Sequence, residues 1–237
     1  MKDKSVGIYV PSYHRADSIV TYNLLKHCTY VVRKSEDKAY KDAGIESLIA
    51  VEDELIDSFP KVRNWIIDNA KEDIVVQVDD DISAFYYINK NNKKEIDADQ
   101  IEMEILRVAQ LLSDLKLGFA SIVMQANVVK YSSEFKFQST IGLMNWYNKE
   151  ALKSKYDTNV TLKADIDFEL SELMNNRIIL IPAYIGANGK YDTNKGGNTE
   201  YRNSQKLNAT VEYLKTKWGR YYEHNYKKNV SKVKVKR

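Results

Sequence analysis

Three consecutive acidic residues, Asp79, Asp80 and Asp81, are the strongest chemical signal in the sequence. They directly follow Ile74–Val78, a run of mostly β-branched residues that is typical of a strand buried on both faces. Adjacent carboxylates repel one another unless a cation compensates them, and Mg²⁺ and Mn²⁺ prefer carboxylate oxygens while leaving positions open for phosphate. At the end of such a strand the run predicts a divalent-metal site that holds a diphosphate. An isolated run of this kind is more often a surface turn or a helix cap.

The elements that must position this run alternate between strand-like and helix-like segments. Strands are expected at residues 6–11, 29–32, 48–51 and 74–78, and helices at residues 17–27, 36–43 and 58–70. Asp17 is the expected N-cap of the first helix, and Pro60 lies in the first turn of the third, where its missing N–H costs nothing. This alternation predicts an α/β fold with a mostly parallel central sheet and helices on both faces.

The rhythm changes after the acidic run. Asp97 and Gln100 have the spacing of a capping box ahead of an apolar stripe, which predicts a helix that ends before Gly118. Further strands are expected at residues 119–124, 137–146 and 178–185, and further helices at residues 167–174 and 207–218. We therefore expect one domain over residues 1–225, with a nucleotide-sugar half up to about residue 90 and an acceptor half after it, followed by a basic tail at 226–237.

Four segments, taken in order, resemble the motifs of GT-A glycosyltransferases over residues 5–185. Asp79-Asp80-Asp81 is similar to the "DXD" motif, and Val10-Pro11-Ser12-Tyr13-His14-Arg15 is similar to the loop that holds the nucleotide after the first strand. Arg63-Asn64 resembles the "RN" pair that family members place against the nucleotide, and Ala164-Asp165-Ile166-Asp167-Phe168 resembles the "ED" segment. The resemblance implies the GT-A variant of the α/β fold.

The resemblance also implies roles for the acidic residues. Asp81 is the principal metal ligand, Asp79 is shared between the metal and the ribose, and Asp80 has no firm assignment. Asp165 is the expected general base of an inverting reaction, with Asp167 as the alternative. Ala164 departs from the pattern, because many relatives have Glu at that place. Without the resemblance, Asp165 and Asp167 are equally well explained as residues that favour the dipole of the following helix.

A further set of residues is expected to bind the nucleotide-sugar donor. Its members are Pro11, Ser12, Tyr13, Arg15, Arg63, Asp79, Lys195, Gly196 and Gly197. Tyr13 is a candidate stacking platform for a pyrimidine base, and the Lys195-Gly196-Gly197 segment could form a flexible lid over the diphosphate. The structural alternatives are an ordinary β-to-α turn, solvent-exposed ion pairs and a plain loop. His224 is expected to be a surface residue and not a metal ligand.

The segments 77–82, 195–197 and 217–219 narrow the resemblance to the small bacteriophage glycosyltransferases related to base J glucosyltransferase. That group is encoded beside TET/JBP-type pyrimidine hydroxylases. The resemblance implies a DNA-modifying enzyme that uses Mn²⁺ or Mg²⁺ and moves sugar from a UDP-sugar to a hydroxymethylated pyrimidine base. Alternatives are a glycosyltransferase with a polysaccharide, lipid or protein acceptor, a sugar-nucleotide nucleotidyltransferase, and an inactive nucleic-acid-binding module.

The composition of the 237 residues is that of an ordinary globular protein, with 43% hydrophobic and 29% charged residues. The single cysteine, Cys28, excludes an internal disulfide and a multi-cysteine zinc site. No apolar stretch is long enough to cross a bilayer, so we expect a cytoplasmic protein, in the host cytoplasm if a phage encodes it. Residues 227–237 contain six basic residues and no acid, which indicates either a phosphate-binding segment or a solvated tail.

Overall fold

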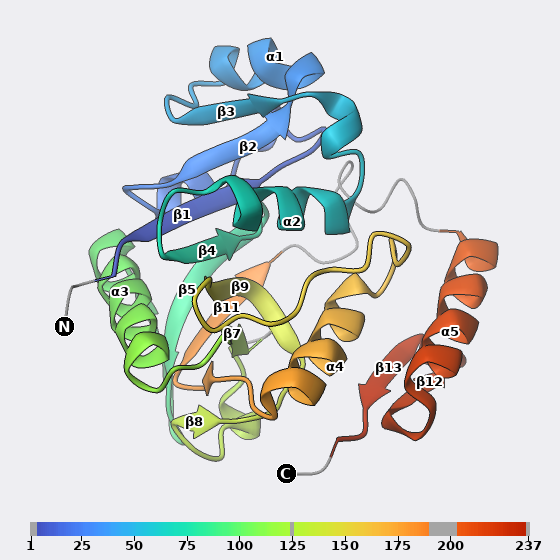
Figure 1. The fold of residues 1–237 in the computed structure, drawn as a ribbon. Coiled ribbons are helices and arrows are strands. Elements are labelled where there is room, and N and C mark those ends of the chain that lie inside the picture. The colour runs from blue at the N-terminus through green and yellow to red at the C-terminus, as the bar shows by residue number, and fades with distance from the viewer. Residues whose placement is uncertain (1–3, 124–125, 190–202, 236–237) are drawn as a thin grey trace.

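The chain folds around a nine-stranded sheet with the order β3-β2-β1-β4-β9-β7-β11-β5-β6 (Figure 1). The structure is a computed structural model that describes residues 4–123, 126–189 and 203–235. The strands of the large sheet are β1 Val6–Pro11, β2 Thr29–Arg33, β3 Leu48–Val51, β4 Ile74–Val78, β5 Ile82–Ile88, β6 Lys93–Ile96, β7 Phe119–Val123, β9 Ile141–Asn148 and β11 Ile185–Gly189. Two smaller sheets pair β8 Phe135–Lys136 with β10 Ile181–Pro182, and β12 Tyr222–Asn225 with β13 Val230–Val233.

Parallel pairing joins β3, β2, β1 and β4, so the carboxyl ends of these four strands meet at one edge of the sheet. Strand β9 then pairs antiparallel with both β4 and β7. Beyond it, β11 is parallel to β7 and antiparallel to β5, which pairs antiparallel with β6. The predicted α/β fold is confirmed, and its antiparallel pairs lie in the half of the sheet that starts at β9.

Helices cover both faces of the sheet (Figure 1). They are α1 Asp37–Asp42, α2 Phe59–Asn69, α3 Ala98–Asp114, α4 Ala164–Asn176 and α5 Ser204–Trp218. Strand β4 shows why, because Ile74, Val76 and Val78 pack into the core cluster that contains the apolar stripe of α3. Its Val75 points to the other face and packs in the cluster that contains residues of α2, α4 and α5. A strand with helices on both faces is buried at every position, as all five residues of β4 are.

Near the acidic run one predicted element is wrong and one observed element was not predicted. The expected helix over residues 17–27 is only a 3₁₀ turn at Thr21–Leu24, because the buried Thr21 side chain is held by the backbone of the acidic run instead of facing along a helix. Residues 82–96, to which no element was assigned, form the β5–β6 hairpin that extends the sheet.

Later segments differ in their limits or in their form. The strand expected at residues 178–185 is two strands, β10 and β11, that belong to different sheets. The strand expected at 137–146 begins at Ile141 and runs to Asn148. Residues 230–233, within the expected basic tail, form β13 and pair with β12, so this part of the tail is a hairpin strand. Among the described residues no helix is both long enough and apolar enough to span a membrane.

The predicted capping box of α3 is confirmed, because both of its hydrogen bonds are present. Its contribution to the stability of the protein can therefore be tested by mutation. The Asp97 side chain accepts a bond from the Gln100 N–H at 2.9 Å, and the Gln100 side chain accepts one from the Asp97 N–H at 3.1 Å. We expect Asp97→Ala to lower the free energy of unfolding by about 1 kcal/mol, measured by urea denaturation. Gln110→Ala, an exposed change in the same helix, should have less effect, and equal losses would contradict the role of the cap.

Candidate active site at the carboxyl edge of the parallel strands

The acidic run begins at the end of β4 and is held there by its backbone. The N–H of Asp79 donates to the carbonyl of Leu143 on β9 at 2.8 Å, which extends the β4–β9 pairing by one residue. The Thr21 hydroxyl donates to the carbonyl of Asp79 at 2.7 Å and accepts the N–H of Ile82 at 3.0 Å. The tight turn between β4 and β5 therefore fixes all three carboxylates at the carboxyl edge of the sheet.

Arg63 of α2 neutralises the first carboxylate. Its guanidinium is ion-paired with Oδ1 of Asp79 and donates to the Gln77 side chain at 3.2 Å. The Gln77 amide in turn donates to the Arg63 carbonyl at 2.9 Å. Only 2% of the Arg63 side chain is exposed, so this predicted donor-binding residue pairs with Asp79 from inside the protein. A buried charge of this kind is stable only with its partner in place.

Arg15 neutralises the other two carboxylates from the loop that follows β1. Its Nη1 is ion-paired with Asp80 and lies 3.2 Å from Oδ2 of Asp81. Asp80 is buried and also accepts a hydrogen bond from the Ser12 hydroxyl, which is bonded to the Tyr40 hydroxyl at 2.6 Å. Asp80, which had no assigned role, therefore holds the loop of Ser12 and Arg15 against the end of β4.

Burial and mutual repulsion act on the protonation of the run. Burial raises the pKa of Asp79 to about 6, with Asp81 and Asp80 adding to the shift and Arg63 opposing it. Burial also raises the pKa of Asp80, against the opposing effect of Arg15. The two arginines thus offset only part of the cost of placing three carboxylates together.

The two predicted base candidates, Asp165 and Asp167, lie in the first turn of α4 but have different surroundings. Asp167 is 1% exposed and accepts hydrogen bonds from the Lys217 ammonium at 2.9 Å and the Trp218 indole N–H at 2.7 Å. These bonds join α4 to the end of α5. Asp165 is only half-buried and lies one turn before Glu169 on the same face of the helix.

Glu169 is a candidate functional residue that the sequence analysis did not identify. It is 1% exposed, and burial together with the charge of Asp165 raises its pKa to about 8. Its carboxyl group accepts the N–H of Ile141 on β9, two residues from the Leu143 carbonyl that binds Asp79. About 7 Å of strand therefore separates the anchor points of the α4 carboxyl pair and of the acidic run. The spacing of Glu169 from Asp165, i and i+4, was the signal available in the sequence.

A pair of buried tyrosines links the two sides of the site. The hydroxyls of Tyr147 and Tyr156 are 2.7 Å apart, and Tyr147 lies within electrostatic range of Arg63 and Asp79. Tyr156 lies within electrostatic range of Asp165, and the Asn64 side chain bonds both its N–H and its carbonyl, at 2.9 and 2.8 Å. Arg63 thus positions the acidic run, and its neighbour Asn64 positions Tyr156, which lies near Asp165.

A protein-family model for TET-associated glycosyltransferases matches residues 6–197 of the chain, and that span contains the acidic run, the two arginines and the carboxylates of α4. The chain belongs to this family. The glycosyltransferase activity that the motifs implied is thereby confirmed. Residues 203–235, with α5 and the β12–β13 hairpin, lie outside the matched span.

Solved structures with a similar fold include glycosyltransferases, which confirms the GT-A variant of the α/β fold. The mannosyltransferase PcManGT from Pyrobaculum calidifontis, in complex with GDP-Man and Mn²⁺, is 17% identical with a TM-score of 0.53, over 79% of this chain and 57% of that chain. S. aureus TarS, residues 1–349, is 13% identical with a TM-score of 0.47, over 91% of this chain and 73% of that chain. A search of curated proteins found no significant match.

The carboxylates of this glycosyltransferase fit a divalent cation that is shared with phosphate. Arg63 bonds Oδ1 of Asp79 and Arg15 bonds Oδ2 of Asp81, whereas the second oxygen of each has no hydrogen-bond partner among the described residues. No cluster of three or more His, Cys, Asp or Glu side chains that could hold a metal occurs within residues 4–123, 126–189 and 203–235. A cation at Asp79 and Asp81 would therefore need oxygens from a diphosphate or water, which is the usual arrangement for Mg²⁺.

The chain approaches Asp81 closely at the end of β11. A Cβ atom on Gly189 would lie 3.1 Å from the Leu143 side chain and 3.6 Å from Oδ1 of Asp81, so glycine gives this strand room beside the carboxylate. The next residues along the chain are 190–202. The predicted donor-binding residues Lys195, Gly196 and Gly197 belong to that segment and lie outside the described residues.

Pro11 is the last residue of β1, and Tyr13 follows it at the same edge. The Tyr13 ring stacks on His14 with centroids 3.8 Å apart, and the Arg33 guanidinium lies 3.8 Å from the ring centroid. Two groups this close must lie on opposite faces of the ring, so a pyrimidine base would have to displace one of them to stack on Tyr13. His14 itself has a left-handed backbone conformation, and its N–H donates to Glu36 at 2.7 Å.

His224 is buried on β12 and not on the surface as expected. Its Nδ1 lies 3.1 Å from the Ser231 hydroxyl, and its Nε2 has no partner among the described residues. Burial and the charges of Lys163 and Lys215 lower its pKa, which favours the neutral ring.

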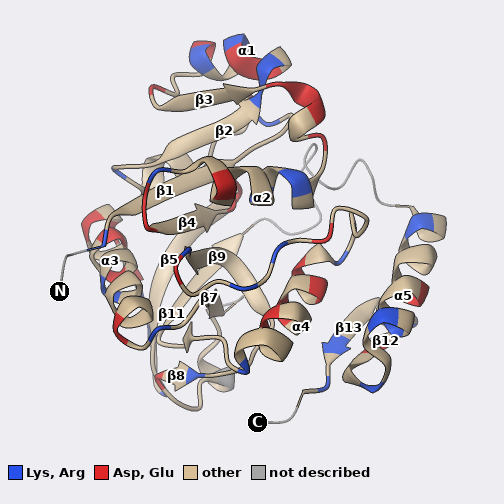
Figure 2. Ribbon diagram, viewed as in Figure 1, with Lys and Arg blue, Asp and Glu red and all other residues tan. Residues whose placement is uncertain are grey.

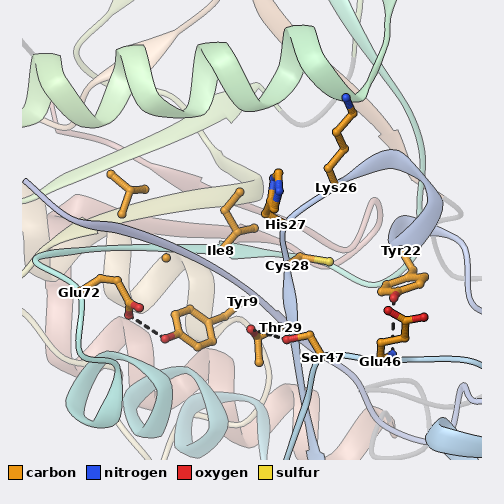
Figure 3. Close-up of a pocket in the computed structure, with 12 residues that line it drawn as sticks. Ile8, Tyr9, Tyr22, Lys26, His27, Cys28, Thr29, Glu46, Ser47 and Glu72 are labelled. Atoms are coloured by element: carbon orange, nitrogen blue, oxygen red, sulfur yellow. Dashed lines mark hydrogen bonds between the residues drawn. The ribbon is translucent and has the colours of Figure 1, made fainter.

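A cavity of about 390 Å³ lies at the opposite end of β1 and β2 (Figure 3). Figure 3 shows the Tyr9 hydroxyl bonded to Glu72, for which the distance is 2.7 Å, and Cys28, which directly precedes β2. None of the predicted site residues lines this cavity. This cavity is therefore separate from the candidate active site at the carboxyl edge of the sheet.

The raised pKa of Glu169 predicts a pH-dependent stability. The folded protein retains a proton on Glu169 between about pH 4.5 and 8, where the unfolded chain releases it, so this group lowers stability as pH rises through that window. We expect Glu169→Gln to gain stability relative to wild type from pH 5 to pH 8.5, by about 1.4 kcal/mol per pKa unit of the shift. Thermal or urea unfolding at the two pH values measures this difference.

The matched control is Glu95→Gln, an exposed residue on β6. Its difference from wild type should be the same at pH 5 and pH 8.5. A Glu169→Gln difference that is also independent of pH would show that Glu169 ionises normally in the folded protein.

Proposed function

We propose that this glycosyltransferase moves a sugar from a UDP-sugar to the hydroxymethyl group of a modified pyrimidine base in DNA, with inversion and with Mn²⁺ or Mg²⁺. The observation that carries the proposal is the arrangement of two acidic groups at one sheet edge. Asp79 and Asp81 each present a carboxylate oxygen beside Arg15 and Arg63, and Asp165 lies on α4 across β9 from them. The first group suits a diphosphate with its cation, and the second suits an acceptor hydroxyl.

In the proposed reaction the acceptor oxygen attacks the anomeric carbon of the sugar. Asp165 takes the proton from the acceptor hydroxyl, the new C–O bond forms, and the bond from the anomeric carbon to the diphosphate oxygen breaks. The nucleoside diphosphate leaves with the electron pair of that bond. One displacement of this kind inverts the anomeric centre. When bound, a divalent cation supplies Lewis-acid stabilisation of the leaving diphosphate.

The protein's own residues hold and tune this arrangement. Arg63 keeps Asp79 in place from below, and Arg15 and Ser12 do the same for Asp80 and the loop after β1. Glu169 lies beneath Asp165 on the same helix face, where its protonated form limits the negative charge beside the base. Asp167, bonded to Lys217 and Trp218, positions the helix and is not available to a substrate.

The donor and acceptor assignments have separate support. PcManGT, whose fold is similar, was solved with GDP-Man and Mn²⁺, which is consistent with a nucleotide-sugar donor and a divalent cation. The family's description as TET-associated favours a hydroxymethylated base as acceptor over a polysaccharide, lipid or protein. The same family match disfavours a nucleotidyltransferase or an inactive nucleic-acid-binding module.

The decisive experiment is mass spectrometry of nucleosides after incubating the protein with Mn²⁺, a panel of UDP-sugars and DNA that contains 5-hydroxymethyluracil or 5-hydroxymethylcytosine. We expect the mass of a hexose or pentose on one of the two bases, loss of the product with EDTA, and no product with Asp81→Asn. Unmodified DNA is the control substrate. No added sugar on either base, with hydrolysis of a UDP-sugar still detectable, would overturn the DNA acceptor and leave glycosyl transfer in place.

The two aspartates of α4 can be separated by mutation. Asp165→Asn removes the proposed base, so transfer should fall by about 100-fold or more with little change in Tm. Asp167→Asn cannot pair with the Lys217 ammonium, so it should lower stability by about 1–3 kcal/mol while folded enzyme transfers sugar within about tenfold of wild type. Rates and thermal unfolding are measured on the same samples. If Asp167→Asn abolishes transfer and Asp165→Asn does not, Asp167 is the base.

A further inference from the structure

Charge is strongly segregated along the chain. Residues 203–237 contain ten lysines and arginines but only two glutamates, a formal net charge of +8. Residues 1–202 contain 26 basic and 31 acidic residues, a net charge of −5. The basic part follows the span that matches the family model, which ends at residue 197. Figure 2 shows basic residues on α5 and β13. The C-terminal unit, residues 203–235 as described, therefore adds a cationic surface to an acidic domain.

The C-terminal unit is folded onto the domain. Val211 and Leu214 of α5 and Tyr222 of β12 are buried in the same core cluster as Phe168 of α4. Lys217 pairs with both Asp157 and Asp167, at 2.9 Å each. These contacts give the unit a defined orientation relative to α4, so its charges are displayed from a fixed scaffold.

The exposed side of the hairpin is the basic side. Strand alternation turns Val233 inward and Lys232 and Lys234 outward, and Lys227 and Lys228 are exposed in the turn between the two strands. Lys234 is paired with Glu223 at 3.0 Å. In the part of the chain that the structure describes, Lys227, Lys228 and Lys232 have no ion pair, so their charge is available to a partner.

This basic surface lies beside the proposed base. Lys163, directly before α4, donates to the carbonyl of Asn229 in the hairpin turn at 3.5 Å. Burial raises the pKa of Tyr222 on β12, and the charge of Asp165 makes a smaller contribution to the shift, so the start of the hairpin is within electrostatic range of that carboxylate. The turn with its two lysines is thus next to the end of α4 at which the acceptor must arrive.

We propose that α5 and the β12–β13 hairpin form a DNA-binding surface whose lysines hold the phosphate backbone of the acceptor and guide its modified base to Asp165. The inference rests on the proposed function, because it assigns a surface to the proposed acceptor. Lysines that neutralise phosphates release counterions, and this supplies sequence-independent affinity. The exposed ring of Tyr226, with Lys215 4.9 Å from its centroid, adds a stacking platform for an unpaired base.

The surface suits DNA better than an anionic membrane. Peripheral membrane helices bury an apolar face of large residues in addition to their basic one. In the described C-terminal unit the exposed large hydrophobic side chains are Tyr213, Tyr226 and Val230, and the apolar side of α5 packs on the domain. The phosphate backbone of DNA can pair with the lysines and does not require an exposed apolar face.

The test is a charge reversal of the three unpaired lysines, Lys227→Glu, Lys228→Glu and Lys232→Glu together. DNA binding is measured by fluorescence anisotropy at several salt concentrations, with and without hydroxymethylated bases. We expect the triple variant to lose about tenfold or more in affinity at low salt, and the slope of log K against log salt to become shallower by about 0.7–0.9 per lost phosphate contact. Binding of UDP and hydrolysis of the UDP-sugar without acceptor should be unchanged.

The matched control reverses three exposed lysines outside the C-terminal unit, Lys71→Glu, Lys90→Glu and Lys94→Glu, with the same change in net charge. Its salt slope should equal that of wild type. Equal losses of DNA affinity in the two variants would contradict the proposed DNA-binding surface and leave only an effect of net charge. So would binding of wild type to phosphatidylglycerol vesicles with no binding to DNA.

The surface and the proposed function fail in different ways. If wild type glycosylates DNA and the hairpin variant binds DNA as tightly as wild type, the surface is wrong and the function stands. If wild type binds DNA through the hairpin but adds no sugar to either modified base, the DNA acceptor is wrong while the surface is supported as a nucleic-acid site.

Discussion

Mutual repulsion of three adjacent carboxylates is the constraint around which the site is built. Asp79, Asp80 and Asp81 sit at the end of a strand that is buried on both faces, where water cannot fully screen them. Two arginines from different elements compensate them, Arg63 from α2 and Arg15 from the loop after β1. Each arginine ties its own element to the end of β4. The electrostatic need of the acidic run thus also holds together the part of the domain that is proposed to bind the nucleotide-sugar donor.

The compensation is incomplete in a way that suits catalysis. The pKa of Asp79 remains raised, to about 6, and one oxygen each of Asp79 and Asp81 is left without a protein partner among the described residues. A cation that arrives with a diphosphate would relieve the remaining repulsion, so binding of the donor and neutralisation of the site are favourable together. Perturbed pKa values and incompletely compensated charges of this kind are commonly concentrated at functional sites.

The proposed acceptor side, around Asp165, depends on the same core through different contacts. The bonded hydroxyls of Tyr147 and Tyr156 connect the surroundings of Asp165 with those of Arg63. Asp167 joins α4 to the C-terminal unit. That unit has the opposite charge to the domain beneath it. The enzyme therefore has the acidic run, which is proposed to bind the donor, and a basic surface on either side of one helix, α4. A negatively charged polymer is repelled by the first and attracted by the second, which favours one direction of approach.

Sequence alone determined the features that depend on neighbours along the chain. The alternation of strands and helices in residues 29–78, the capping box at Asp97 and the acidic run after β4 all follow from local periodicity or from adjacent residue types. The resemblance to GT-A glycosyltransferases also rested on short motifs and their order, and the family match confirmed it. Such signals survive without knowledge of the fold because their physical causes act within a few residues.

Only the tertiary structure decided which of these residues act together. The 3₁₀ turn at Thr21–Leu24 replaces an expected helix because Thr21 bonds the backbone of residues about 60 positions away. Asp165 and Asp167 are two residues apart and look alike in sequence, yet packing of α5 buries one of them against Lys217 and Trp218. Glu169 has a raised pKa because the fold removes water from it. Burial and long-range pairing depend on the whole chain, so no local pattern could assign these roles.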